Sequence, residues 1–280
     1  MTLPGKRPLL LLAAIAAAMA APLAGAAPPA AAQTTLRFGL DSDADALDPT
    51  LARTYIGRII FASLCDKLVD IDPTLTIVPQ LAEQFSWVDS KTLAFKLRAG
   101  LTFHDGTPVD SEAVRYSLMR HATMQGSTRR AEIAMLDTIE IIDALNFKLH
   151  LKAASAPFLS QLTDRSGMIV SPKAAEAAGK DFSLHPVCAG PFKFTERVIQ
   201  DRIVLDRFGS YWNKGAIHLD RVIFRPITDA SVRLANLQAG ALDMMQGILP
   251  TDVAKITADP KLRTSITDGL GYQSLTFNIA

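Results

Sequence analysis

The sequence predicts an α/β fold built around a mixed β-sheet. Segments with helical spacing of hydrophobic residues alternate along the 280 residues with short segments of strand-like alternation. Such alternation is typical of parallel sheets covered by helices, but neighbouring pairs of strand-like segments also occur, and hairpins are antiparallel. The combination therefore favours a mixed sheet over a purely parallel one.

The first half of the chain supplies hairpins and helices. A strand at 36–40 precedes a polar, turn-rich loop at 41–49, and isoleucines at helical spacing predict a helix over about 54–68. We further expect, in chain order, a strand at 93–97, a hairpin joining 139–142 to 147–151, a short helix at 156–163, a short strand at 168–170 and a helix at 172–178.

The second half contains paired strands at 191–195 and 202–205 and another strand at 222–225. Asp229 is a good N-cap for a helix that ends near Gly240, and a shorter helix is expected at 250–258. A last strand-like segment follows at 274–279. Because backbone groups of a strand need partners, it either pairs with an earlier strand or belongs to a longer chain.

Residues 103–118, FHDGTPVDSEAVRYSL, predict a turn that leads into a helix. The Asp-Gly-Thr-Pro run at 105–108 is typical of turns, and Asp110 stands where an N-cap belongs. Val114 and Leu118, four residues apart, give the helix one apolar face.

The N-terminus predicts export. Lys6 and Arg7 precede an apolar run at 9–21, and small residues suitable for cleavage follow up to Gln33. Residues 1–32 are thus expected to be a signal peptide, the alternative being a membrane anchor. A lipoprotein is not expected, because the first cysteine is Cys65. The mature chain is predicted to be periplasmic.

Charge and length constrain the partners and the organisation. Without the leader, 27 Lys and Arg stand against 28 Asp and Glu, so neither nucleic acid nor an anionic membrane surface is an expected partner. The remaining 248 residues exceed a typical domain, and two structural units are plausible.

Cys65 and Cys188 are the two cysteines of the chain. In an oxidising compartment an even pair favours a disulfide, and two separate buried thiols are the alternative. A zinc site is not expected, because two thiols without histidines at ligand spacing are too few ligands. We expect no metal and no cofactor.

Several segments resemble, in order, the family 5 extracellular solute-binding proteins that serve peptide and nickel ABC importers. Besides 103–118, they are VPQLAEQFSWVDSKTLAFKLRAGLTFHDGTPVDSEAV, HPVCAGPFKF and RIVLDRFGSYWNKGAIHLDRVIFRPITDASVRLANLQAGALDMM. The resemblance covers about 36–278, which is nearly all of the mature chain. Tyr211 and Trp212, within the last segment, are expected to pack in the interior rather than to stack on a ligand.

The resemblance implies one lobe of a type II (cluster C) periplasmic binding protein fold. The first-lobe α/β domain would comprise 33–52 and 182–268, with an α+β subdomain inserted at 53–181. Residues 269–280 would begin a second lobe that is largely missing. Since ligand in this family lies between two lobes, we expect the chain to be a fragment and its affinity to be weakened.

The resemblance also implies ligand-binding residues. Arg165 lies in a loop that offers an arginine to an anionic chelate in nickel-binding relatives, and Arg129 or Arg130 lies near a segment that offers another. A guanidinium can bind a carboxylate with two hydrogen bonds, although these arginines can equally be solvated or paired with aspartates. Asp41 and Ser42, in the loop after the first strand, are further candidates.

A search for catalytic motifs supports a binding protein rather than an enzyme. The sequence has no nucleophile elbow, no zinc-binding helix and no phosphate-binding loop. The favoured reading is a receptor that delivers a peptide-like or chelate ligand to the permease of an ABC importer and meets the membrane only through it. A secreted hydrolase with an unrecognised site and a non-binding fragment are the alternatives.

Overall fold

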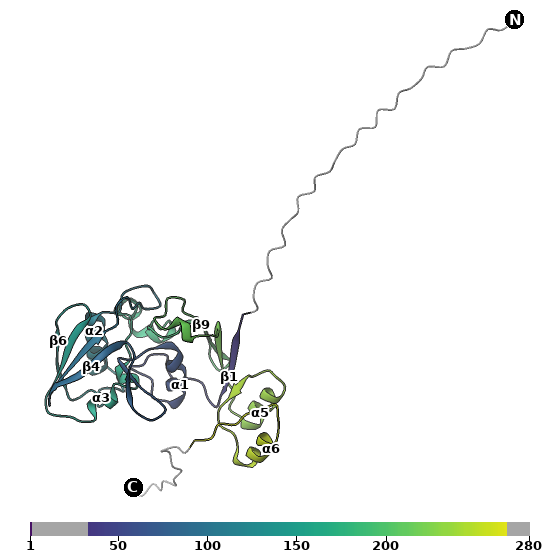
Figure 1. Ribbon diagram of the computed structural model, residues 1–280. Helices are drawn as coiled ribbons and strands as arrows, with labels where there is room; N and C mark the ends of the chain where they lie inside the picture. The colour runs from purple at the N-terminus through teal and green to yellow at the C-terminus, as the bar shows by residue number, and fades with distance from the viewer. Residues whose placement is uncertain (2–32, 268–280) are drawn as a thin grey trace. The chain divides into compact units, whose positions relative to one another are not determined.

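The structure is a computed structural model that describes Met1 and residues 33–267. Residues 33–267 form one compact unit (Figure 1). The predicted signal peptide and the strand expected at 274–279 lie outside the described residues.

A five-stranded mixed sheet confirms the predicted fold class. Its strand order is β11-β1-β10-β9-β8. β1 is parallel to both of its neighbours, whereas β9 is antiparallel to β10 and to β8. The strands span Thr35–Leu40 (β1), Phe192–Val198 (β8), Arg202–Arg207 (β9), Arg221–Pro226 (β10) and Met244–Met245 (β11).

A second, antiparallel sheet has the order β4-β5-β7-β6, and a two-stranded sheet pairs β2 with β3. The expected hairpin joins β6 and β7, and Asp143 Oδ1 holds its turn by accepting from the amides of Leu145 and Asn146. Strands β2 to β4 were not expected from the sequence. These strands span Val69–Ile71 (β2), Ile77–Pro79 (β3), Ala82–Asp89 (β4), Thr92–Leu97 (β5), Leu136–Ile141 (β6) and Asn146–Leu151 (β7).

Four of the α-helices, α1, α2, α4 and α5, begin at side chains that accept hydrogen bonds from free amides of the first turn. Asp110 accepts from the amide of Ala113 and Asp229 from that of Val232, both at 2.8 Å, which confirms the two predicted caps. The helices span Tyr55–Leu64 (α1), Ser111–Thr123 (α2), Phe158–Gln161 (α3), Pro172–Ala178 (α4), Ala230–Gln238 (α5) and Val253–Thr257 (α6). Short 3₁₀ turns span Arg165–Gly167 (η1), Gly179–Leu184 (η2), Lys214–Ala216 (η3) and Pro250–Asp252 (η4).

Two predicted elements differ from the structure. The first helix ends at Leu64 rather than near residue 68, because Cys65 takes an extended backbone conformation. The strand expected at 168–170 is reduced to one bridge between Lys67 and Met168. The amide of Val170 donates instead to the hydroxyl of Ser117 on α2, so this segment has no strand partner to extend the ladder.

Two clusters of buried side chains form the interior. One lies on the antiparallel sheet, where Phe95 and Phe147 stack with ring centroids 5.2 Å apart. The other lies between α1 and one face of the five-stranded sheet, and it includes Phe61 and Phe224. Burying an aromatic of this kind stabilises the fold by about 1.5–3 kcal/mol. Since α1 falls within 53–181 but packs on the first-lobe sheet, the division into lobe and subdomain stays a prediction.

A disulfide joins Cys65, at the end of α1, to Cys188, and the two Cα atoms are 4.9 Å apart. His104, in the 103–118 segment, forms hydrogen bonds with the turn that carries Cys188. Its amide donates to the carbonyl of Cys188 at 2.9 Å, and its Nε2 lies 3.0 Å from the carbonyl oxygen of Gly190. Burial lowers the pKa of His104 to about 4, so the ring is neutral. The 103–118 segment therefore has a structural role at the disulfide.

Candidate functional site

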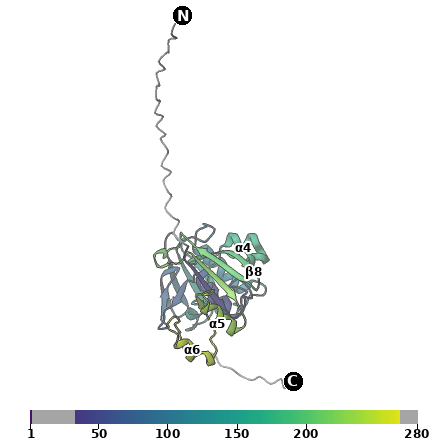
Figure 2. The ribbon, with the colours of Figure 1, turned by 90° about the vertical axis from the view of Figure 1, so that its right-hand side faces the viewer.

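The carboxyl ends of β1 and β10 mark the edge of the sheet where a ligand site is expected. After β1 the chain enters α1, which packs on the face that carries Leu40 and Phe224. After β10 it enters α5, which approaches the opposite face at Gly39, where an added Cβ would lie 2.6 Å from the Leu242 side chain that follows α5. In open α/β sheets, ligands bind where helices after adjacent parallel strands lie on opposite faces. We call residues 41–54 and 227–229 the carboxyl edge, and α5, which follows residues 227–229, is labelled in Figure 2.

Asp41 and Ser42 lie at the carboxyl edge, directly after β1. Both are exposed, and the Ser42 hydroxyl donates to Asp41 Oδ1 at 3.0 Å. The next residue is fixed more firmly, since Arg197 of β8 pairs with Asp43 at 3.2 Å and the amide of Gln200 donates to the same carboxylate. The structure thus leaves these two predicted residues open to solvent on an anchored loop.

A buried ion pair anchors the middle of this loop. The Arg120 guanidinium, on α2, donates to both carboxylate oxygens of Asp48 at 2.8 and 2.7 Å. Both side chains are buried, and the Thr50 hydroxyl next to them contacts Nδ1 of buried His121 at 2.9 Å. Burial lowers the pKa of His121 to about 4. Sequence reasoning missed this pair, which joins positions 72 residues apart and has no local motif.

Two of the three predicted arginines meet at one acceptor. Arg129 Nη2 donates to the carbonyl oxygen of Ala52 at 3.1 Å, and Arg165 Nη1 donates to the same oxygen at 3.2 Å. Arg165 Nη1 also donates to the carbonyl of Thr54 at 3.1 Å, and Arg129 Nη1 donates to Glu132 at 2.5 Å. Burial, together with the positive charge of Arg129, lowers the pKa of Arg165.

Arg130 does not share the acceptor of Arg129 and Arg165. Its guanidinium donates to the carbonyls of Ala122 and Met124 at 3.1 and 3.2 Å, where it caps the C-terminal end of α2. This position satisfies the last carbonyls of the helix, and no contact in the described part of the chain joins Arg130 to the carbonyl of Ala52.

Arg58, which was not predicted from the sequence, lies close to Arg165 and Asp164. Arg58 Nε lies 3.4 Å from Asp164 Oδ1, and Arg165 Nε lies 3.7 Å from the same oxygen. Among the described residues, neither Asp164 Oδ1 nor Arg165 Nε has a hydrogen-bond partner. We call Arg58, Arg129 and Arg165, with the carboxylates of Asp164 and Glu132, the arginine cluster. No sequence motif marks Arg58, which is a single arginine on the exposed side of α1.

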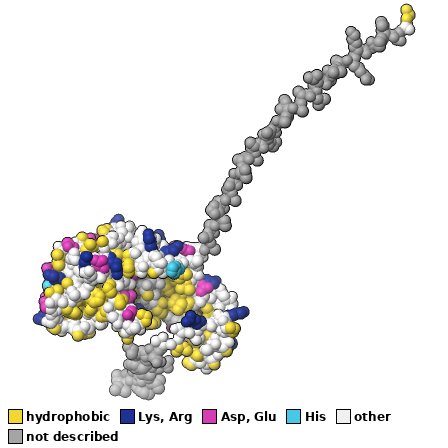
Figure 3. Space-filling view, viewed as in Figure 1, with side chains coloured by type: hydrophobic (Ala, Val, Ile, Leu, Met, Phe, Trp, Pro, Cys, Tyr) yellow, Lys and Arg dark blue, Asp and Glu magenta, His cyan; other side chains and the backbone are white. Residues whose placement is uncertain are grey.

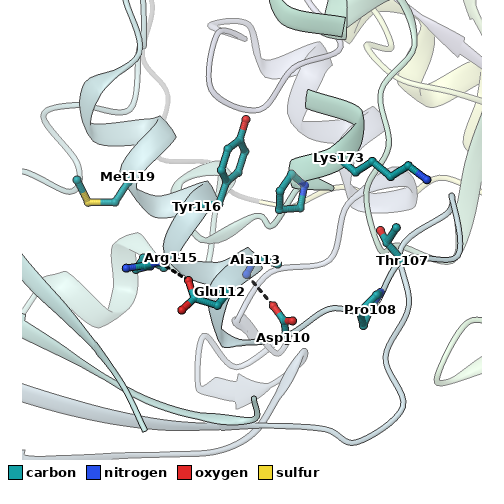
Figure 4. A pocket seen from close by; sticks show the side chains of 10 residues that line it. Thr107, Pro108, Asp110, Glu112, Ala113, Arg115, Tyr116, Met119 and Lys173 are labelled. Atoms are coloured by element: carbon teal, nitrogen blue, oxygen red, sulfur yellow. Dashed lines mark hydrogen bonds and ion pairs between the residues drawn. The ribbon is translucent and has the colours of Figure 1, made fainter. Parts of the chain in front are cut away.

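A groove of about 540 Å³ lies away from these residues, between the 107–108 turn, α2 and the start of α4 (Figure 4). Three of its charged side chains already have partners: Asp110 caps α2, and Glu112 pairs with Arg115 at 2.5 Å. None of the predicted ligand-binding residues lines it.

Tyr211 is buried, and Trp212 is half-buried and packs against the core of the antiparallel sheet. The Tyr211 hydroxyl and the Trp212 indole N–H donate to the buried carboxyl of Asp66 at 3.0 and 2.8 Å. Within residues 33–267, no cluster of three or more His, Cys, Asp or Glu side chains is arranged to hold a metal ion. No described helix is long and apolar enough to cross a membrane.

Comparison with known proteins places the chain among solute-binding proteins. Residues 76–280 match the profile of the bacterial extracellular solute-binding proteins, family 5. A glutathione-binding protein, GsiB, of Pectobacterium atrosepticum is 28% identical over 237 residues, which cover 84% of this chain and 46% of that protein.

Solved structures agree. The periplasmic binding protein AgaA of A. tumefaciens R10, in complex with agropinic acid, is 31% identical with a TM-score of 0.77, over 81% of this chain and 46% of that one. The nickel ABC transporter structure from Bacillus halodurans is 29% identical with a TM-score of 0.71, again over 81% and 46%.

This chain thus spans about half the length of the relatives that it matches. The profile match nevertheless covers most of its residues and includes the 103–118 segment. The chain therefore belongs to the family 5 bacterial extracellular solute-binding proteins.

Proposed function

We propose that this chain supplies a ligand-binding wall of a periplasmic receptor for an ABC importer, and that the solute is peptide-like or an anionic chelate. The observation that carries the proposal is the arginine cluster beside the carboxyl edge of a family 5 lobe. Guanidinium groups bind carboxylates with two hydrogen bonds, and both peptides and chelates bear carboxylates.

The related proteins support this class of ligand. GsiB binds glutathione, and AgaA binds agropinic acid. Asp41 and Ser42 stand exposed on the anchored loop and are the proposed polar contacts next to the cluster. In this proposal residues 1–32 direct export, 53–181 form the inserted subdomain, and permease subunits receive the ligand.

A binding experiment with a turnover control tests the proposal. The purified chain is titrated calorimetrically with glutathione, trialanine, agropinic acid and nickel-histidine, and each solution is then analysed by mass spectrometry. We expect heat of binding with at least one solute, which is recovered intact. Consumption of a solute would favour the hydrolase alternative, and absence of heat with all four would contradict the receptor.

A further inference from the structure

We propose that Arg58, on the exposed side of the first turns of α1, contacts a carboxylate group of the solute directly, and that Tyr55, on the same side, packs against the apolar part of the solute. Arg129 and Arg165 act as positioning residues for the segment that begins α1. The inference rests on the proposed function and names the residues and the ligand group involved.

The two buried arginines are already committed to the protein. The side chains of Arg129 and Arg165 are 6% and 12% exposed, and both donate to the carbonyl of Ala52. Arg165 also donates to the carbonyl of Thr54, whose side chain caps α1. Because their bonds go to the main chain just before α1, these arginines set the position of its first turn.

Arg58 is placed differently. Its side chain is 45% exposed, and its acidic neighbour Asp164 lies 3.4 Å from Nε without forming a hydrogen bond. Asp164 Oδ1 stands between two guanidiniums, those of Arg58 and Arg165, and bonds to neither in the described part of the chain. A solute carboxylate can therefore form the two-bond pair with Arg58 that Asp164 does not form.

The charge of the site favours an anion. The three guanidiniums of the cluster face the two carboxylates of Asp164 and Glu132, which leaves one positive charge in excess. Arg53, exposed on the preceding segment, does not change this balance, because the carboxylate of Asp45 accepts from its amide at 2.7 Å and offsets its charge. An anionic group is attracted to this excess, and a neutral ester is not.

Tyr55 supplies an apolar surface beside this charge. Its side chain is among the most exposed large hydrophobic groups of the described residues, at 69%. Tyr55 and Arg58 are three residues apart on one helix and so share a face. Next to the α5–α6 end, the space-filling view shows a hollowed surface rich in hydrophobic side chains (Figure 3). An exposed aromatic next to a cation suits a solute that carries a carboxylate on an apolar frame.

The test compares variants of the full chain with glutathione and with its diethyl ester as probes. Arg58→Gln is expected to weaken glutathione binding about tenfold or more and to leave binding of the ester unchanged, because only the acid form offers carboxylates. Arg58→Lys keeps the charge but not the paired geometry. Its affinity for glutathione should lie between that of the unmodified chain and that of Arg58→Gln. Tyr55→Leu should weaken both probes. Arg115→Gln, on α2, removes an arginine of similar exposure (53%) that also has one acidic partner, and it should match the unmodified chain.

The outcomes distinguish a failure of the role inferred for Arg58 from a failure of the proposed receptor function. If Arg58→Gln remains folded by its thermal transition and binds glutathione as the unmodified chain does, the inference is overturned and the receptor proposal stands. If the unmodified chain binds trialanine but not glutathione, the inference is overturned as well. If it binds neither these probes nor agropinic acid or nickel-histidine, the proposed function fails together with the inference.

Discussion

Arg129 and Arg165 donate to the same carbonyl oxygen, that of Ala52, at 3.1 and 3.2 Å, although 36 positions separate them in the chain. Two like charges at one acceptor repel each other, and burial of Arg165 adds a desolvation cost. Glu132, which pairs with Arg129, offsets part of this cost. The arrangement fixes the entry into α1, and the stability of this segment should therefore depend on buried polar contacts.

The buried pair between Arg120 and Asp48 should be essential for stability. Asp48→Asn leaves an arginine charge buried without its carboxylate, which costs about 3–5 kcal/mol of the free energy of unfolding. Urea denaturation measures the loss. The exposed pair Arg115–Glu112 gives the control, since Glu112→Gln should cost at most about 1 kcal/mol. Equal losses in the two variants would contradict the anchoring role of Asp48.

Removing the disulfide should lower the stability of the whole unit. The bridge between Cys65 and Cys188 closes a loop with a sequence separation of 123, and its loss costs about 2–5 kcal/mol. Denaturation of a Cys65→Ala, Cys188→Ala double variant, with and without a reducing agent, measures this. The reductant should destabilise the unmodified chain and leave the double variant unchanged. An unmodified chain that is insensitive to complete reduction would contradict the prediction.

His104 should make the protein less stable in mild acid. Its pKa is about 4 in the fold and about 6.5 when unfolded, because burial disfavours the charged ring. The unfolded chain therefore binds more protons between these values, and the contribution is complete above pH 6.5 and falls as pH drops towards 4. His104→Gln should flatten the dependence of unfolding free energy on pH in that window. An unchanged slope would show that the ring is not buried as a neutral group.

Asp66 should make the protein less stable as pH rises, which is opposite to the effect of His104. Burial raises its pKa to about 7, against an ordinary value of 3.8, even though Trp212 and Tyr211 donate to it. The folded state then holds a proton that the unfolded chain releases, so this stabilisation is full below pH 3.8 and is lost as pH rises through 7. Asp66→Asn should remove this loss between about pH 4 and 7 in denaturation experiments. If the variant and the unmodified chain keep a constant difference across that range, the carboxyl is charged throughout.

Local features of the fold were predictable from the sequence, whereas long-range ones were not. The caps Asp110 and Asp229 were found because an N-cap acts within three residues of its own helix. The end of α1 was placed too late, because hydrophobic spacing continues past Leu64 while the extended conformation at Cys65 ends the helix. The expected strand at 168–170 does not form because the amide of Val170 donates to Ser117, which lies on a helix distant in sequence.

The candidate site was only partly predictable for the same reason. Arginines can be chosen from sequence for their chemistry, but a main-chain acceptor such as the carbonyl of Ala52 leaves no residue pattern. Sequence reasoning therefore named Arg129 and Arg165 without their partners and grouped Arg130 with them, although Arg130 caps α2. Arg58 was missed because a single arginine on a helix face gives no motif.

Hydrogen exchange of the intact chain with and without glutathione tests the central claim most directly, because it locates the solute while detecting it. The account predicts slower exchange in residues 41–58 and 164–167 on adding glutathione, and no change along α2 at 111–119, where the 540 Å³ groove lies. Protection confined to α2 and the start of α4, or no protection anywhere at saturating glutathione, would contradict it.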